Sequence, residues 1–204
     1  MYNTNTYKLI FILLLSVFLT TCQYTKAPDQ IVQSDPLSEA ALELTKQLVI
    51  YDPSYFFIDY PNGDIPKHKG VCTDVVIRAY RSLDVDLQQL VHEDMKKNFN
   101  LYPKLWGLKS TDTNIDHRRV PNLMTFFERH GITKPMTQNA KDYIPGDIVC
   151  WRLDGGATHI GIVVDKKTRD GERYKIVHNI GFGQVLQDCL FDYTIIGHYR
   201  YGID

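Results

Sequence analysis

The 204-residue sequence lacks a strong charge of either sign, since 23 basic and 24 acidic residues leave a formal net charge of −1. A nucleic-acid partner would require a basic surface, so the composition argues against one. Internal repeats are also missing, which excludes repeat architectures, and the sequence contains no low-complexity blocks. An apolar run from Leu9 to Leu19 is too short to span a bilayer comfortably, although its length suits the core of a signal peptide.

The N-terminal segment predicts export. Lys8 precedes the apolar run, which ends at Leu19-Thr20-Thr21-Cys22, a sequence similar to the lipobox of bacterial lipoproteins. We therefore expect a signal peptide over residues 1–22, lipidation of Cys22, and a polar tether to the membrane over residues 23–34. Simple cleavage nearby and an uncleaved anchor are the alternatives. All three predict export, and a lipid anchor would make the protein a periplasmic-facing lipoprotein of the cell envelope.

The cysteine count constrains the rest of the chain. Of four cysteines, Cys22 lies at the lipobox, which leaves Cys72, Cys150 and Cys189. An odd number of thiols in an oxidising compartment leaves at least one unpaired. Either Cys150 and Cys189 form a bridge, or all three thiols are free. Both arrangements leave Cys72 without a partner.

Residues 35–204 are enough for one domain with a substantial core. Apolar residues at helical spacing and capping residues predict helices over residues 35–48, 72–83, 86–99 and 121–130. Short segments rich in β-branched and aromatic residues predict strands over residues 147–153, 159–165, 174–179 and 195–201. Helices first and an antiparallel meander second indicate the α+β class.

Two side chains could form a nucleophile–base pair. Cys72 begins a predicted helix, and a helix N-terminus favours the nucleophilic thiolate, although a small buried apolar residue is the simpler interpretation. His159 begins a strand in which Gly161 shares its face, so that a helix could approach closely. His159 could then act as general base toward Cys72, and His178 on the next strand could orient it, with Asn179 as the rival for that role.

Four stretches occur in the order typical of the NlpC-type papain-like superfamily, and they are Gly70–Asp74, Pro145–Val149, His159–Val163 and Val177–Asn179. Longer stretches closely resemble a bacterial family known as domain of unknown function 1287, and they are Gly70–Ala79, Val91–Met95, Asn114–Leu123 and Gly197–Arg200. The resemblance implies a papain-like fold, with N-terminal helices packed on a small antiparallel sheet, and a Cys72–His159–His178 site. Many members of the superfamily are secreted hydrolases that cut amide bonds in peptidoglycan stem peptides.

The resemblance also suggests roles outside this triad. Tyr60, twelve residues before Cys72, would lend its hydroxyl to the oxyanion site, although ordinary aromatic packing is equally compatible with it. From their residue types alone, Arg118 and Arg119 could clamp a substrate carboxylate, such as a peptide terminus or a diaminopimelate side chain, and we expect Asp74 to bind substrate with them. The alternative for the arginines is a structural role in ion pairs with nearby acidic residues.

The leading hypothesis is a cysteine peptidase or amidohydrolase acting on cell-wall peptide, with no cofactor and no metal. Acyl transfer at the same Cys–His site is the second hypothesis, and a non-catalytic envelope module that binds peptidoglycan is the third. A zinc site built from Cys72, His159 and His178 ranks lower, because no closely spaced pair of ligands supports it. His92 and its two acidic neighbours cannot all face one ion from a helix.

Overall fold

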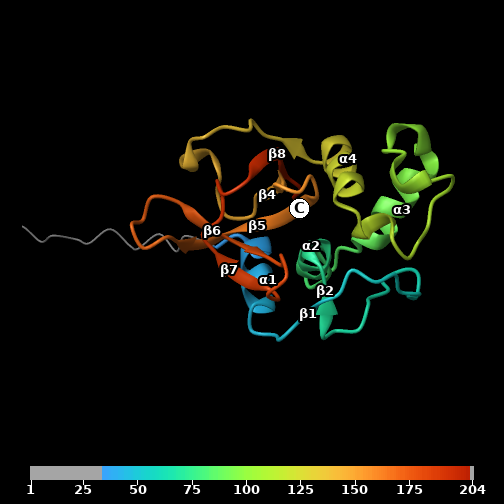
Figure 1. Ribbon diagram of the computed structural model, residues 1–204, viewed down its shortest axis with the longest axis horizontal. Coiled ribbons are helices and arrows are strands. Elements are labelled where there is room, and N and C mark those ends of the chain that lie inside the picture. Colours follow the sequence, from blue (N-terminus) through green and yellow to red (C-terminus); the bar gives the residue numbers. More distant parts are fainter. Residues whose placement is uncertain (1–33, 203–204) are drawn as a thin grey trace, which may run out of the picture. The chain divides into compact units, whose positions relative to one another are not determined.

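A computed structural model describes residues 34–202, and Figure 1 shows the order of the helices and strands. The predicted signal peptide, Cys22 and all of the tether except Ser34 lie outside the described residues. The α-helices in this part are α1 (Pro36–Leu44), α2 (Cys72–Arg81), α3 (Leu87–Lys97) and α4 (Val120–His130). None of the helices within residues 34–202 is both long and apolar enough to cross a membrane.

The main sheet has the strand order β3-β8-β4-β5-β6-β7, and every neighbouring pair is antiparallel. Its strands are β3 (Ile132–Thr133), β4 (Ile148–Arg152), β5 (Thr158–Lys167), β6 (Tyr174–His178), β7 (Val185–Gln187) and β8 (Thr194–Arg200). Helices followed by an antiparallel sheet confirm the α+β class. The two short edge strands, β3 and β7, were not predicted from the sequence.

The capping residues identified in the sequence begin the helices. The Asp35 carboxylate accepts the N–H groups of Leu37 and Ser38 at 3.0 and 3.1 Å, and so satisfies two of the free donors at the start of α1. Helix α1 ends earlier than predicted, at Leu44. Leu48, which was expected on its buried face, is 91 % exposed.

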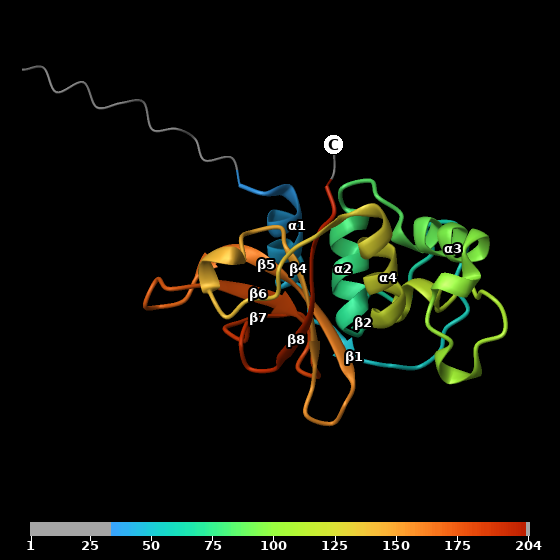
Figure 2. The same ribbon diagram turned by 90° about the horizontal axis from the view of Figure 1, so that it is seen from above.

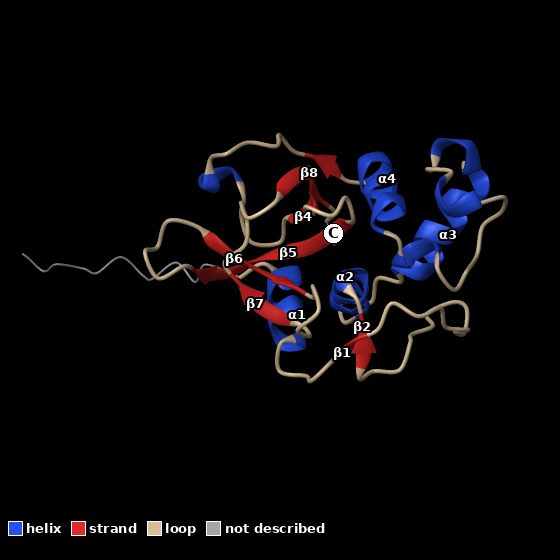
Figure 3. Cartoon of the chain, in the orientation of Figure 1, coloured by secondary structure: helices blue, strands red, loops and turns tan. Residues whose placement is uncertain are grey.

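The sheet separates two hydrophobic cores. On one face, Ile160, Ile162 and Val164 of β5 pack against α1, α2 and α4, and we call this the helix-side core. On the other face, Trp151 and Val163 pack against the segment that contains Cys189, and we call this the outer core. Figures 2 and 3 show α2 and α4 beside the sheet, with α3 farther out, next to α4. Alternation along β5 therefore directs successive side chains into different cores.

A short parallel pair of strands precedes α2. Strand β1 (Ile50–Tyr51) pairs with β2 (Lys69–Gly70), and Tyr51 lies opposite Gly70 in this register. Because Gly70 stands two residues before Cys72, the pairing places Tyr51 close to the start of α2. The chain between the two strands forms a long loop, with 3-10 helices occurring later at Phe99–Leu101, Leu105–Gly107, Asp116–Arg118 and Ala140–Asp142.

The Pro-Gly-Asp sequence before β4 has a structural role. Gly146 adopts a positive φ of 86°, and a Cβ atom there would come within 2.2 Å of the Asp35 carboxylate. The fully buried Asp147 carboxylate accepts from three side-chain nitrogen atoms, namely Lys134 Nζ at 2.9 Å, His198 Nε2 at 2.9 Å and Arg200 Nη1 at 2.8 Å. These contacts join the start of β4 to β8 and to the segment after β3.

Candidate functional site

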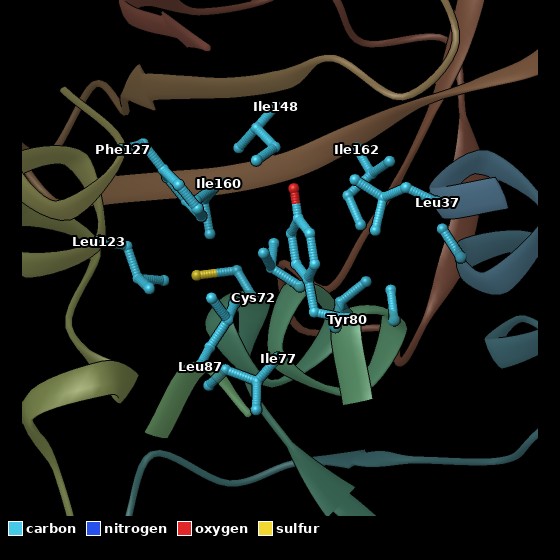
Figure 4. Close-up of a cluster of buried hydrophobic side chains, with 14 of the residues drawn as sticks. Leu37, Cys72, Ile77, Tyr80, Leu87, Leu123, Phe127, Ile148, Ile160 and Ile162 are labelled. Carbon is cyan, nitrogen blue, oxygen red and sulfur yellow. The ribbon is translucent and has the colours of Figure 1, made fainter. Parts of the chain in front are cut away.

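Cys72 is the first residue of α2 and lines a pocket of about 200 Å³. The thiol-bearing residue is only 7 % exposed. The residues that line this pocket come from the β1 loop, the start of α2, the segment before α4 and the start of β5, and they include Tyr51, Thr73, Trp106, Arg119 and Thr158. Figure 4 shows the sulfur directed toward Leu123, with Ile160 and Phe127 nearby.

The electrostatics of Cys72 differ from the expectation. Burial, with a smaller contribution from the nearby Asp74 carboxylate, raises the pKa of its thiol to about 12, while the Ile160 backbone acts in the opposite direction. The helix N-terminus was expected to favour the thiolate. The desolvation of the sulfur outweighs that effect, so that Cys72 is a neutral thiol near neutral pH.

His159 and His178 form a buried pair. The Nε2 atom of His159 lies 2.8 Å from Nδ1 of His178, and the two rings meet nearly edge to face. The His159 ring also lies against Trp151, at 5.7 Å between ring centroids. Burial lowers the pKa of His159 to about 3, with His178 contributing to the shift, and burial also lowers the pKa of His178. Both imidazoles are therefore neutral near neutral pH.

Cys72 and His159 are neighbours around β5 rather than partners in a hydrogen bond. Cys72 packs with Ile160 in the helix-side core, whereas the His159 ring lies with Trp151 on the outer face of the sheet. No hydrogen bond joins the two side chains within residues 34–202. The expected contact between Cys72 and His159 is therefore absent from the resting structure. His159 Nδ1 also has no hydrogen-bond partner of any other kind in the described part of the chain, so this atom is free to accept a proton.

Gly161 provides space for β6, and the prediction that it makes room for a helix was wrong. A Cβ atom at this position would lie 2.6 Å from Ile176 Cγ2, 3.0 Å from the Val177 oxygen and 3.1 Å from His178 Cβ. The missing side chain allows β6 to approach β5 closely, and this approach brings His178 against His159.

Asn179, the rival third member, takes a different position. Its side-chain amide donates to the Gly70 oxygen at 3.0 Å. This bond joins the end of β6 to the strand that leads into Cys72. Asn179 therefore positions the backbone of the site, and His178 is the residue that contacts His159.

Asp74 and Arg118 were predicted to bind substrate, but they are paired with each other. The Arg118 Nε and Nη2 atoms donate to the two Asp74 oxygens at 2.9 and 3.1 Å, and both side chains are almost fully buried. The same Asp74 carboxylate accepts the Val71 N–H at 2.7 Å at the start of α2. This pair therefore secures the helix that carries Cys72.

Arg119 points toward the pocket. Its guanidinium lies over the Trp106 ring at 4.4 Å, and its buried Nη1 atom has no hydrogen-bond partner among the described residues. Arg119 lines the same pocket as Cys72. Of the two arginines singled out in the sequence, it is the one still able to receive a carboxylate.

The structure places Tyr60 away from Cys72 and brings Tyr51 close to it. Tyr60 packs edge to face on His92 at 5.2 Å, beside a different surface pocket. Tyr51 lines the Cys72 pocket, and the pKa of its hydroxyl is raised by burial first, and then by the negative charges of the ionised Cys72 thiolate and of Asp74. The sequence offered one signal for Tyr51, its place directly before Asp52-Pro53 at the start of the aromatic loop.

The three cysteines in the described part of the chain are unbridged and buried. Cys150 packs in the helix-side core and Cys189 in the outer core, so the sheet separates them and the possible bridge is not formed. The Cys189 sulfur instead lies 3.6 Å from His178 Nε2. Within residues 34–202, no group of three or more His, Cys, Asp or Glu side chains is arranged to hold a metal ion.

Comparison with known proteins places the chain in a family. It is 54 % identical over 165 residues to the uncharacterized protein YijF of Escherichia coli strain K12, and the match covers 81 % of this chain and 80 % of that protein. The family model described as "Domain of unknown function (DUF1287)" matches residues 38–201. This range contains Cys72, Arg119, the histidine pair and nearly all of the helices and strands described above. The chain therefore belongs to the DUF1287 family.

Proposed function

We propose that this protein is an exported cysteine amidohydrolase or peptidase with a papain-like fold of the NlpC type, and that it acts on amide bonds of peptidoglycan stem peptides. The observation that carries the proposal is the arrangement at one end of β5. Cys72 is at the N-terminus of a helix and lines a pocket, and it lies beside Ile160, the strand residue that follows His159. His159 in turn is paired with His178.

The reaction begins from neutral groups. As the Cys72 sulfur attacks the substrate carbonyl, its proton passes to Nδ1 of His159, and the same proton then goes to the departing amine. Water attacks the resulting thioester, and its proton returns through His159, which releases the acid and restores the thiol. Catalytic hydrogen bonds are often long in resting enzymes and tighten when substrate binds, so the absent Cys72–His159 bond is compatible with this sequence.

The oxyanion would form near two donors. The first N–H groups of an α-helix have no partner within the helix, and the Cys72 backbone belongs to this set. The Tyr51 hydroxyl lines the same pocket and can supply the second hydrogen bond. Tyr51 would thus take the role that was predicted for Tyr60.

The substrate class follows from Arg119. A guanidinium with no carboxylate partner among residues 34–202, beside a candidate nucleophile, suits a substrate whose scissile amide is near a carboxylate. Stem peptides carry such carboxylates at their termini and on side chains. The signal peptide and the lipid anchor at Cys22 would bring the domain to this substrate in the cell envelope.

A non-catalytic envelope module is the second candidate, because one observation favours it. Cys72 is 7 % exposed, and burial raises the pKa of its thiol to about 12, as for an inert core cysteine. In that case, the pocket would bind peptidoglycan fragments without cleaving them.

The test is to incubate the full chain, purified in detergent, with soluble peptidoglycan fragments and to identify the products by mass spectrometry. We expect cleaved peptides that have gained one water, and a loss of at least about 100-fold in rate for Cys72→Ala and His159→Gln. Cys150→Ala, a buried thiol on the same side of the sheet, is the matched control. Undiminished cleavage by Cys72→Ala would overturn the proposal. Binding without cleavage by the wild type would favour the second candidate, and transfer of the acyl group to an added amine would indicate acyl transfer.

A further inference from the structure

Three side chains form a hydrogen-bonded chain across the outer face of the sheet, from β7 through β6 to β5. Gln187 Oε1 lies 3.1 Å from Nε2 of His178, and Nδ1 of His178 lies 2.8 Å from Nε2 of His159. In the β6–β7 register, Gln187 pairs with Ile176, so its side chain reaches His178 diagonally. The chain ends at His159 Nδ1, which has no hydrogen-bond partner within residues 34–202.

The polarity of this chain follows from its outer end. A carbonyl oxygen only accepts, so His178 Nε2 carries the hydrogen of this bond when the Gln187 amide oxygen faces it. A neutral imidazole carries one ring hydrogen, and burial keeps both histidines neutral near neutral pH. Nδ1 of His178 is then an acceptor, and His159 must donate from Nε2. This leaves a lone pair on His159 Nδ1, the atom that would receive the Cys72 proton.

The opposite polarity would disable the base. If the neighbour of His178 Nε2 donated a hydrogen bond, His178 would donate from Nδ1 into His159 Nε2, and His159 Nδ1 would already carry a hydrogen. The Cys189 thiol, 3.6 Å from the same Nε2 atom, could only donate to it in this reversed state. Because Gln187 is exposed, water can satisfy its NH₂ group while its oxygen faces His178.

We propose that Gln187 is a positioning residue that sets the tautomer of His159 through His178, and so keeps His159 Nδ1 ready to accept a proton. This inference rests on the proposed function for its catalytic meaning, but the tautomer itself can be measured without a substrate. Gln187 was not among the residues singled out in the sequence, and it does not line the pocket that contains Cys72.

The experiment measures nitrogen-15 NMR shifts of the histidine side chains in the full chain, for the wild type and for Gln187→Glu, Gln187→Leu and Gln187→Lys. A carboxylate only accepts, so Gln187→Glu should keep His159 with a protonated Nε2 and a bare Nδ1, as in the wild type. Gln187→Leu should give a mixture of tautomers, and Gln187→Lys, which only donates, should shift the population toward protonated Nδ1. Exposure of this residue makes all three changes compatible with folding.

Activity provides the second measurement. We expect Gln187→Glu to cleave peptidoglycan fragments at nearly the wild-type rate, and Gln187→Leu and Gln187→Lys to be slower by about tenfold or more. A wild-type His159 with protonated Nδ1, or tautomers that are the same in all four proteins, would overturn the inference. If the tautomers shift as expected but the wild type cleaves nothing, the proposed function fails while the assignment of Gln187 to the tautomer stands.

Discussion

Arg118 and Asp74 form a two-point ion pair beneath the candidate nucleophile, with N–O distances of 2.9 and 3.1 Å and side chains that are 2 % and 3 % exposed. The two residues are 44 positions apart in the sequence, and their contact joins the segment before α4 to the first turn of α2. The position of Cys72 therefore depends on a buried ion pair between the segment before α4 and the first turn of α2.

Removing one partner of this pair should destabilise the protein strongly, because the other charge would remain buried without compensation. We expect Arg118→Met to lower the free energy of unfolding by about 3–5 kcal/mol, measured by urea denaturation. Glu43→Gln, which breaks the exposed contact with Lys46, is the control and should cost less than about 0.5 kcal/mol. If both variants lost the same free energy of unfolding, burial would not determine how much an ion pair contributes to stability.

The reactivity of Cys72 should increase with pH well into the alkaline range. Burial raises the pKa of its thiol to about 12, so the thiolate fraction grows with pH and does not level off near neutrality. The measurement is the rate of iodoacetamide labelling at Cys72 against pH, resolved by peptide mass spectrometry. A plateau below the reference thiol pKa of about 8.5 would instead show an activated thiolate in the resting protein.

Arg119 should make Cys72 selective for anionic reagents. Iodoacetate and iodoacetamide carry the same leaving group, but only iodoacetate is attracted by a guanidinium in the pocket. We expect Arg119→Gln to lower the ratio of the two labelling rates by roughly threefold or more, and added salt to lower the wild-type ratio. Arg119→Lys keeps the charge and should retain most of the preference. A ratio that is unaffected by Arg119→Gln would remove this residue from the carboxylate site.

The protein should lose stability as the pH falls from neutrality. Burial, with a further contribution from the Arg118 charge, lowers the pKa of His117 to about 3. The unfolded chain takes up this proton near pH 6.5 while the folded state does not, so unfolding becomes easier between about pH 6.5 and pH 3, by up to about 1.4 kcal/mol per pH unit. His159 and His178, whose pKa values are also lowered, act in the same direction.

The check is the urea midpoint as a function of pH for the wild type, His117→Gln and His68→Gln. His117→Gln should flatten the acid dependence by about one proton, whatever its effect on stability at neutral pH. His68 is exposed, so its replacement is the control for the loss of a histidine that is not buried. An identical slope in all three proteins would show that His117 is protonated in the folded state.

Adding one methyl group at Gly161 should disturb the histidine pair. The new Cβ atom would lie 2.6 Å from Ile176 Cγ2 and 3.1 Å from His178 Cβ, so β6 would have to move away from β5. We expect Gly161→Ala to cost about 1–3 kcal/mol in stability and to change the NMR signals of both histidines. Gly155→Ala, where no atom lies within 4 Å of the added Cβ, is the control. Unchanged histidine signals in Gly161→Ala would contradict the proposed role of this glycine.

Periodic patterns predicted most of the fold. Helix α2 carries apolar residues at helical spacing, and β5 has a long run of β-branched residues, so both could be located within a few positions. Strand β7 covers only Val185–Gln187 and is mostly exposed, so it has too few buried residues to produce a pattern. Its absence from the prediction is the reason that Gln187 was not considered beside His178.

The site was harder to predict, because its contacts depend on where loops return. Tyr60 is nearer to Cys72 in the sequence than Tyr51, yet the pairing of β1 with β2 brings Tyr51 to the pocket. Similarly, two consecutive arginines have different roles, because the Asp74 carboxylate pairs with Arg118 and leaves Arg119 at the pocket. Neither outcome follows from residue type or from spacing along the chain.

The three buried, unbridged cysteines have a consequence for how this protein must be handled. Since no disulfide cross-links residues 34–202, the native state does not need an oxidising solution to form. Before it folds, however, an oxidised chain could join any two of the three thiols, and two of them end in cores on opposite sides of the sheet. Such a chain would be trapped by its own covalent bond, so refolding yields should rise when a reductant is present and fall when it is removed.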